Sequence, residues 1–323
     1  MSYCLVTGGA GFIGAHLAEG LLQRGHQVRI LDDFATGVWT NVHAVQAHVT
    51  QAGLPCPLDV IDGSILDPQA LATAMRGIDY VFHQAALPSV VFSVQEPLLS
   101  NRVNVEGTLT VLLAARDAGV RRVIYAGSSA AYGDHPELPQ RETHPTHPLS
   151  PYALAKLTGE EYCRLFTELY QVETVTLRYF NVFGPRQNPN SPYAAVIPKF
   201  ILAALRHEPI LVYGDGAQSR DFTYVNNIVH GNVLAMTAPE VAGQVLNLAD
   251  GSRTTLLQLI AAIEALTQQP VQVQFFEARV GDVRHSQADV SRAKALLGFE
   301  PPVNLEQGLQ HTLAYYQQHL AAY

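Results

Sequence analysis

A glycine-rich stretch near the start of the chain, residues 7–14, most constrains the fold. It follows a short apolar run, residues 3–6, and precedes a segment with helical apolar spacing, residues 15–22. At the start of a helix, backbone N–H groups can approach a phosphate closely only where no Cβ blocks the way. The stretch therefore predicts a phosphate-binding turn between a strand and a helix, and its spaced glycines are Gly8, Gly11 and Gly14.

An acidic residue follows the second predicted strand. Residues 28–31 are apolar enough for a buried strand, and Asp32 comes next, close to the ~20-residue spacing of a ribose-binding acid in dinucleotide sites. A carboxylate at this strand end accepts hydrogen bonds from a ribose 2′-hydroxyl and repels a 2′-phosphate. No arginine follows in residues 33–36. We therefore expect NAD, not NADP, with residues 33–37 forming a loop over the adenosine end.

Composition narrows the class of protein. The chain has 323 residues, 48% of them hydrophobic, and a formal net charge of −8. It is long enough for a large α/β domain or two linked domains, and its charge argues against nucleic-acid binding. Its three cysteines, Cys4, Cys56 and Cys163, form no CxxC pair. Neither a signal peptide nor an apolar run of ~18 residues is evident, so we expect a soluble, cytoplasmic protein.

Strand and helix patterns alternate along the first half of the chain, which predicts an α/β, Rossmann-type, doubly wound parallel sheet. Ligands of such sheets bind beyond the carboxyl ends of the strands. Further strands are expected at residues 58–63, 79–86, 122–126 and 174–181, with helices at 67–75, 101–118 and 151–170. Residues 39–57 suggest no clear element.

We expect two regions. Residues 1–181 form an NAD-binding domain, to which elements near residues 222–250 return. Residues 182–323 form mainly a smaller, mixed substrate-binding region that includes a helix at 197–206.

Tyr152 and Lys156 lie four residues apart at the start of a predicted helix and so share one face. A free tyrosine, with a pKa near 10, is a poor base at neutral pH, but a nearby ammonium favours the phenolate. Ser128, at a strand end, could hydrogen-bond the same substrate oxygen. Taken alone, this Tyr/Lys spacing is common on helix surfaces. Together with the glycine turn and Asp32, it predicts oxidation of a secondary alcohol beside a hydride acceptor.

These residues carry a family resemblance along essentially the whole chain. The chain resembles an extended short-chain dehydrogenase/reductase and, within that class, the UDP-hexose 4-epimerases, most closely bacterial ones acting on UDP-N-acetylglucosamine. The matching segments are residues 7–14, 32–33, 83–86, 104, 128–133, 152–156, 178–181, 213–216, 220–222 and 279–282.

The resemblance implies a cytoplasmic homodimer, paired through helices such as 101–118 and 152–170, with permanently bound NAD. It implies that Tyr152 takes the 4-hydroxyl proton of a UDP-hexose while a hydride leaves C4, giving a 4-keto sugar that turns over and is reduced on its other face. The implied catalytic residues are Ser128, Tyr152 and Lys156. The implied cofactor-binding residues are Gly8, Gly11, Phe12, Ile13, Gly14, Asp32, Asp33, Thr36, Gly37, Ser64, Ile65, Gln84, Ala85, Ala86, Asn104, Tyr152, Lys156, Tyr179 and Val182. The implied substrate-binding residues are Ser89, Ser128, Ser129, Asn181, Ala195, Val196, Tyr213, Arg220, Arg279, Asp282 and Ser286.

One position departs from the family pattern. Many members have an acid and an apolar residue on the third-strand turn, where the adenine edge is held, and here Ser64 and Ile65 stand there. Either Asp62 takes over this contact or the contact is lost. At position 12, phenylalanine replaces an equally common tyrosine, which should be harmless.

Rival functions differ at a few positions. Related 4,6-dehydratases carry an Asp-Glu pair where this chain has Ser129 and Ala130, and decarboxylases carry a glutamate at the place of Ala130. A UDP-uronate 4-epimerase and a non-catalytic NAD-binding protein are further alternatives. The resemblance implies that Ser286 lies beside the C2 substituent of the hexose, where a small residue leaves space for an N-acetyl group. We therefore expect UDP-GlcNAc and UDP-GalNAc to react, and UDP-Glc and UDP-Gal as well.

Histidines suggest no metal site. His135, His144 and His147 lie in an irregular loop without metal-ligand spacing. His83, at a strand end, is expected to be a packed core residue.

Overall fold

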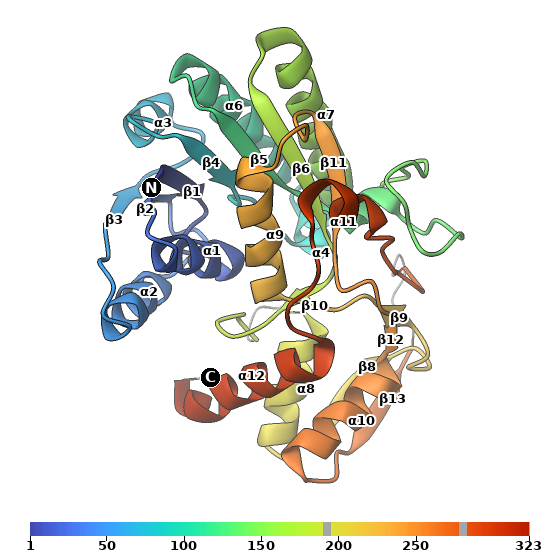
Figure 1. The fold of residues 1–323 in the computed structure, drawn as a ribbon. Coiled ribbons are helices and arrows are strands. Elements are labelled where there is room, and N and C mark those ends of the chain that lie inside the picture. Colours follow the sequence, from blue (N-terminus) through green and yellow to red (C-terminus); the bar gives the residue numbers. More distant parts are fainter. Residues whose placement is uncertain (190–194, 278–282, 323) are drawn as a thin grey trace.

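The computed structural model describes residues 1–189, 195–277 and 283–322. A sheet of seven parallel strands forms the centre of the larger body, in the order β11-β6-β5-β4-β1-β2-β3 (Figure 1). The strands are β1 (Tyr3–Thr7), β2 (Gln27–Asp32), β3 (Leu58–Asp62), β4 (Tyr80–His83), β5 (Arg122–Ser128), β6 (Glu173–Tyr179) and β11 (Gln244–Leu248).

Helices cover both faces of this sheet, as a doubly wound fold requires. On β1, Cys4 and Val6 pack into the core on one face and Leu5 into the core on the other, because side chains alternate along a strand. The first core contains residues of α1 (Phe12–Gln23), α2 (Trp39–Gln51), α9 (Val225–Thr237) and α11 (Ser291–Leu297), and the second those of α3 (Pro68–Ala74), α6 (Gly107–Asp117) and α7 (Pro151–Tyr170). The predicted fold class is confirmed.

The carboxyl ends of the strands meet at one edge of the sheet. Thr7, just before the glycine turn, pairs with Leu31 on one side and His83 on the other. Two strands along, Ser128 pairs with Tyr179. Parallel pairing thus brings the turn after β1, the end of β2, the loop after β4 and the ends of β5 and β6 to a common edge.

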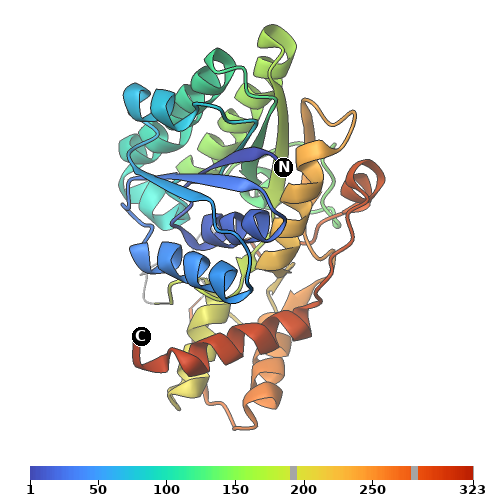
Figure 2. The same ribbon diagram turned by 60° about the vertical axis from the view of Figure 1, so that its left-hand side comes forward.

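A smaller body lies against this edge (Figures 1 and 2). It has its own apolar core, and Phe12 and Ile13 of α1 pack against that core from the larger body. Its elements are α8 (Val196–Leu205), β8 (Ile210–Tyr213), α10 (Leu256–Thr267), β13 (Val273–Phe276) and α12 (Leu305–Gln318). The short pairs β7 (Val182–Phe183) with β10 (Thr223–Tyr224) and β9 (Ser219–Arg220) with β12 (Thr254–Thr255) belong to the connections, and a 3₁₀ turn (Leu320–Ala322) follows α12.

Three segments differ from the sequence-based expectation. Residues 39–51, which suggested no element, form α2, whose Val42, Val45 and Val49 enter the core. The helix expected at 101–118 is not continuous: α5 (Pro97–Asn101) passes through a π-helical turn (Arg102–Glu106) before α6. The helix after the glycine turn begins at Phe12, three residues earlier than expected, with Gly11 as its N-cap and Gly14 in its first turn.

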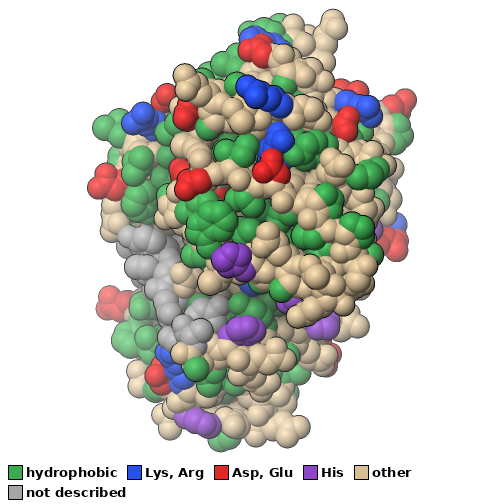
Figure 3. All heavy atoms as spheres, turned by 90° about the vertical axis from the view of Figure 1, so that its left-hand side faces the viewer, with side chains coloured by type: hydrophobic (Ala, Val, Ile, Leu, Met, Phe, Trp, Pro, Cys, Tyr) green, Lys and Arg blue, Asp and Glu red, His purple; other side chains and the backbone are tan. Residues whose placement is uncertain are grey.

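On the face that carries α2, described basic and acidic side chains lie near one another (Figure 3). This face has no one-signed basic area of the kind that nucleic acids favour. Among the described residues, no helix has the length and apolar character needed to span a bilayer.

Candidate active site

The backbone of the glycine turn is packed too closely for side chains at Gly8 and Gly14. A Cβ on Gly8, whose φ is +70°, would lie 2.6 Å from the backbone nitrogen of Ala85, and one on Gly14 would overlap the carbonyl oxygen of Gly8. Gly11 is the N-cap of α1 and has no side chain to cap the first-turn N–H groups. These donors are thus available to a ligand, and a helix N-terminus favours an anion.

Asp32 organises the neighbouring loop. Its carboxylate accepts hydrogen bonds from the backbone nitrogens of Ala10 and Phe34, both at 2.9 Å. Burial raises the pKa of Asp32, and these two hydrogen bonds oppose that rise. A Cβ on Gly37 would stand 2.9 Å from both carboxylate oxygens of Asp32. A glycine at this position therefore keeps the space beside the carboxylate open, where a ribose could bind. Asp33 and Thr36 are exposed in the same loop.

Ser128, Tyr152 and Lys156 come together beyond β5. The hydroxyl of Ser128 lies near that of Tyr152 and lowers the pKa of the phenol. Lys156, one turn along α7 and 5% exposed, donates from Nζ to the carbonyl oxygen of Ala126 at 2.9 Å. This ammonium also lies 5.0 Å from the centre of the Tyr125 ring.

The protonation of this cluster follows from its burial. Burial raises the pKa of Tyr152, and the hydrogen bond to Ser128 lowers it. Burial also lowers the pKa of Lys156 to about 8. The ammonium of Lys156 is directed to the main chain of β5. The hydroxyl of Ser128 is the direct partner that favours the phenolate.

The loop after β4 is held from two sides. Gln84 donates from Nε2 to the hydroxyl of Tyr179 at 3.0 Å, and Tyr179 in turn is bonded to Asn232 of α9. Asn104, in the π-helical turn, forms two hydrogen bonds with the backbone of Leu87. Its Oδ1 accepts from the Leu87 nitrogen at 2.8 Å, and its Nδ2 donates to the Leu87 carbonyl oxygen at 3.1 Å. Such turns often occur at functional sites because they aim one side chain out of helical register.

His83 lies beneath this loop as a core residue. It is 1% exposed and contacts the hydroxyls of Thr7 (2.8 Å) and Thr108 (3.0 Å). Burial lowers its pKa to about 3, so the ring is neutral.

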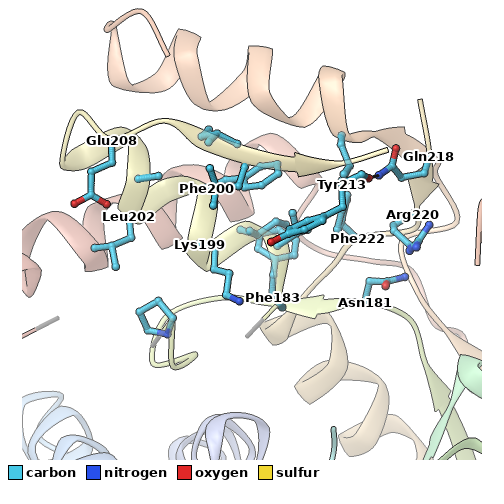
Figure 4. Close-up of a pocket in the computed structure, with 18 of the residues that line it drawn as sticks. Asn181, Phe183, Lys199, Phe200, Leu202, Glu208, Tyr213, Gln218, Arg220 and Phe222 are labelled. Atoms are coloured by element: carbon cyan, nitrogen blue, oxygen red, sulfur yellow. Dashed lines mark hydrogen bonds between the residues drawn. The ribbon is translucent and has the colours of Figure 1, made fainter. Parts of the chain in front are cut away.

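A pocket of about 540 Å³ opens between the ends of β6 and β7 and the smaller body. Figure 4 shows Asn181 and Arg220 at one end and Glu208 and Leu202 at the other, with Lys199 and Tyr213 between them. Apolar and aromatic side chains form much of the wall, including Phe183, Phe200 and Phe222, and two cations line it. This combination suits a flat base together with an anionic group.

Asn181 connects the pocket to the segment that carries Ser286. It has a left-handed φ of 28°, and its Nδ2 donates to the carbonyl oxygen of Asp221 (3.2 Å) and to Oγ of Ser286 (3.3 Å). The carboxylate of Asp221, fully buried, accepts from the backbone nitrogens of Asp250, Gly251 and Ala288. Burial raises the pKa of Asp221 to about 7. Ser286, 8% exposed, is thus held beside the pocket.

The remaining predicted residues fall into three groups. The pocket is lined by Val182, Ala195, Val196, Tyr213 and Arg220. At the sheet edge, the half-buried residues are Ala85, Ala86 and Ser129. Ser89 caps α4 (Val90–Gln95), Ser64 accepts from the backbone nitrogen of Leu66 at 3.4 Å, and Ile65 is buried against α6. Arg279 and Asp282 lie outside the described residues.

Sequence reasoning missed several pocket residues. Lys199, Phe200 and Gln218 line the pocket, yet they belong to ordinary helix and loop patterns. No spacing signal could have identified them, because they meet only through the packing of α8 against β8 and β9.

This chain is similar to known proteins over nearly its whole length. Residues 4–249 match the sequence model of the NAD dependent epimerase/dehydratase family. A UDP-glucose 4-epimerase of Mycolicibacterium smegmatis is 36% identical over 314 residues, 97% of this chain and 98% of that protein. A UDP-N-acetyl-alpha-D-glucosaminuronate decarboxylase of Bacillus cytotoxicus is 34% identical over 326 residues, 98% of each.

Solved structures are similar over the same length. A UDP-N-acetylglucosamine 4-epimerase from Methanobrevibacter ruminantium, in complex with UDP-N-acetylmuramic acid, superposes with a TM-score of 0.90 at 38% identity. The match covers 98% of this chain and 99% of that one.

Proposed function

The chain belongs to the NAD dependent epimerase/dehydratase family, and on this premise we propose that it is a UDP-hexose 4-epimerase. Its substrates are the C4 epimers UDP-GlcNAc and UDP-GalNAc, and also UDP-Glc and UDP-Gal. The observation that carries the proposal is that Tyr152 and Lys156 of α7 lie with Ser128, the last residue of β5, at the same sheet edge as the pocket.

NAD, when bound, supplies the acceptor and donor of the hydride at C4. Gly8, Gly11 and Gly14 would hold its pyrophosphate, and Asp32 its adenosine ribose. Ser128 orients the 4-oxygen of the sugar, while Tyr152 removes the 4-hydroxyl proton and later returns it to the same oxygen. The transient 4-keto sugar can then be reduced on its opposite face, which inverts C4 with no net redox change.

Arg220 and Lys199 supply positive charge for the diphosphate, since guanidinium and ammonium donors complement phosphate oxygens. Tyr213 and Phe222 supply apolar surface for the base. Residues 1–181, with the returning elements near 222–250, thus serve the cofactor, and residues 182–323 serve mainly the UDP-sugar.

Two rival reactions require acids at positions where this chain has none. Dehydration needs an Asp-Glu pair and decarboxylation a glutamate, but the turn after Ser128 presents Ser129 and Ala130. These side chains can neither donate nor accept the proton that water loss requires.

The test is incubation of the purified protein with UDP-GalNAc, with no added cofactor, followed by NMR of the sugar. We expect UDP-GlcNAc to form until the two epimers reach equilibrium. A 4-keto-6-deoxy sugar would indicate a dehydratase. A parallel incubation with UDP-N-acetylglucosaminuronate tests decarboxylation and uronate epimerisation. If none of the UDP-sugars changes although nucleotide is bound, a non-catalytic NAD-binding protein becomes the better account.

A second copy of this chain covers an apolar surface on α4, α5 and α7. Val91, Val94 and Leu98 are 46%, 63% and 85% exposed, and Leu154 is 54% exposed. Exposed apolar patches of this kind favour association. Light scattering after size exclusion should give the mass of a dimer, and Leu98→Glu should give a monomer.

A further inference from the structure

The first turn of α7 carries Tyr152, and its N–H groups need partners from outside the helix. Ser150 is the N-cap, and its Oγ accepts from the backbone nitrogen of Ala153 at 3.1 Å. Pro151, the first helical residue, has no N–H. The backbone N–H of Tyr152 donates to Oγ of Ser93 at 3.0 Å, across 59 residues of sequence.

Ser93 is fully buried on α4. Its hydroxyl proton goes to the carbonyl oxygen of Val90 at 2.6 Å, which leaves the oxygen lone pairs free to accept from Tyr152. The Ser93 hydroxyl is therefore oriented by its own helix, independently of α7. A backbone turn of α4 and the main chain of Tyr152 are joined through one side-chain oxygen.

Other parts of α7 are fixed by different contacts. Lys156 donates to Ala126 of β5, and Glu160 forms a buried two-pronged ion pair with Arg178 of β6 (2.6 and 2.9 Å). These contacts lie one and two turns beyond Tyr152. At the turn that carries the phenol, Ser93 supplies the tertiary hydrogen bond to the main chain.

We propose that Ser93 is a positioning residue for the reaction: its Oγ holds the main chain of Tyr152 and thereby sets the phenol against Ser128. This inference rests on the proposed function, because it assigns Ser93 a part in the proton transfer made by Tyr152. Displacement of a reacting group by about 1 Å can lower a rate ~10²-fold. A lost anchor should therefore act on the chemical step more than on substrate binding.

The test compares Ser93→Ala and Ser93→Cys with wild-type holoenzyme. The cysteine variant fills the same volume but has a weak acceptor, so it can be measured if the alanine variant folds poorly. The control is Thr312→Ala on α12, which removes another buried hydroxyl, one that donates to Gly308 of its own helix. The readouts are kcat and KM with UDP-GalNAc, and hydrogen exchange at the Tyr152 amide.

We expect kcat to fall ten- to a hundredfold in both Ser93 variants, with KM changed less than about threefold. The Tyr152 amide should exchange at least tenfold faster, whereas Thr312→Ala should leave both readouts near wild type. Unchanged kcat with a protected amide would overturn the inference, as would a loss carried by KM or shared equally with the control. If wild-type protein converts no UDP-sugar, the proposed function fails, and the amide exchange still decides whether Ser93 holds Tyr152.

Discussion

Asn181 and Ser286, 105 residues apart in the sequence, are joined by a hydrogen bond of 3.3 Å from the Asn181 amide to Oγ of Ser286. Asn181 follows β6 at the sheet edge, and Ser286 comes from the segment before α11. The bond joins Asn181, which lines the pocket, to the segment before α11. Under the proposed function, the small side chain of Ser286 would lie beside the C2 substituent of the sugar.

Enlarging Ser286 should exclude N-acetyl sugars. In Ser286→Tyr, an aromatic ring replaces a side chain that is 8% exposed, and overpacking costs on the order of 1–3 kcal/mol. We expect kcat/KM for UDP-GalNAc to fall at least ~10-fold relative to UDP-Gal, measured in competition. Ser286→Ala, which removes only the bond to Asn181, should retain both substrates. Wild-type selectivity in Ser286→Tyr would place the specificity elsewhere.

Tyr152→Phe should abolish turnover while the protein still binds UDP-sugar and NAD. The ring keeps its packing, but the hydroxyl near that of Ser128 is lost. Loss of a general base typically lowers the rate ~10²–10⁴-fold. Calorimetry with UDP, together with the nucleotide content of the variant, separates binding from chemistry. Near-normal activity would show that another group removes the proton.

The pH dependence of kcat should bend at about pH 8. Tyr152 acts as the phenolate and its pKa is raised, so the rate should increase as pH rises. Lys156 has a pKa of about 8 and loses its charge above that pH, which removes support for the phenolate. The increase should therefore level off. In Lys156→Met the rate should be lower throughout, and the bend should be missing from its pH profile.

Asp32→Ala should weaken the retention of NAD. The variant removes the acceptor of two backbone hydrogen bonds, from Ala10 and Phe34, and removes the charge that disfavours a 2′-phosphate. Nucleotide released by denaturation should be NAD in wild type and substoichiometric in the variant. The matched control is Asp59→Ala on β3, which removes an exposed carboxylate that pairs with Arg29 of β2. This variant should retain NAD.

Glu19→Gln should destabilise the contact between the two bodies. Glu19 of α1 pairs with Arg186 at 2.5 Å, and Arg186 is only 6% exposed. Removing the charge of Glu19 leaves Arg186 as an uncompensated buried cation, which should lower the free energy of unfolding by on the order of 3–5 kcal/mol. Glu168→Gln breaks an exposed pair with Arg164 and should cost less than about 1 kcal/mol. Urea unfolding of both variants checks the difference, and equal costs would contradict it.

Features with a short-range cause were visible in the sequence. The strand, glycine turn and helix around residues 3–22, the acid at Asp32 and the four-residue spacing of Tyr152 and Lys156 depend on local geometry. The parallel sheet followed from the alternation of strands and helices. Family membership, fold class and use of NAD are all confirmed.

Features made by distant segments were decided only by the tertiary structure. The bonds Ser93–Tyr152 and Asn181–Ser286 join elements far apart in the chain, and the pocket wall around Lys199 brings several elements together. The π-helical turn that carries Asn104 interrupts a helix whose sequence pattern is continuous. A serine or an asparagine has no periodicity that marks its partner, because hydrogen bonds depend on where packing brings two segments together. Local geometry thus determined which groups are available for chemistry, and the packing of α4 on α7 and of the smaller body on the sheet edge decided how they are held.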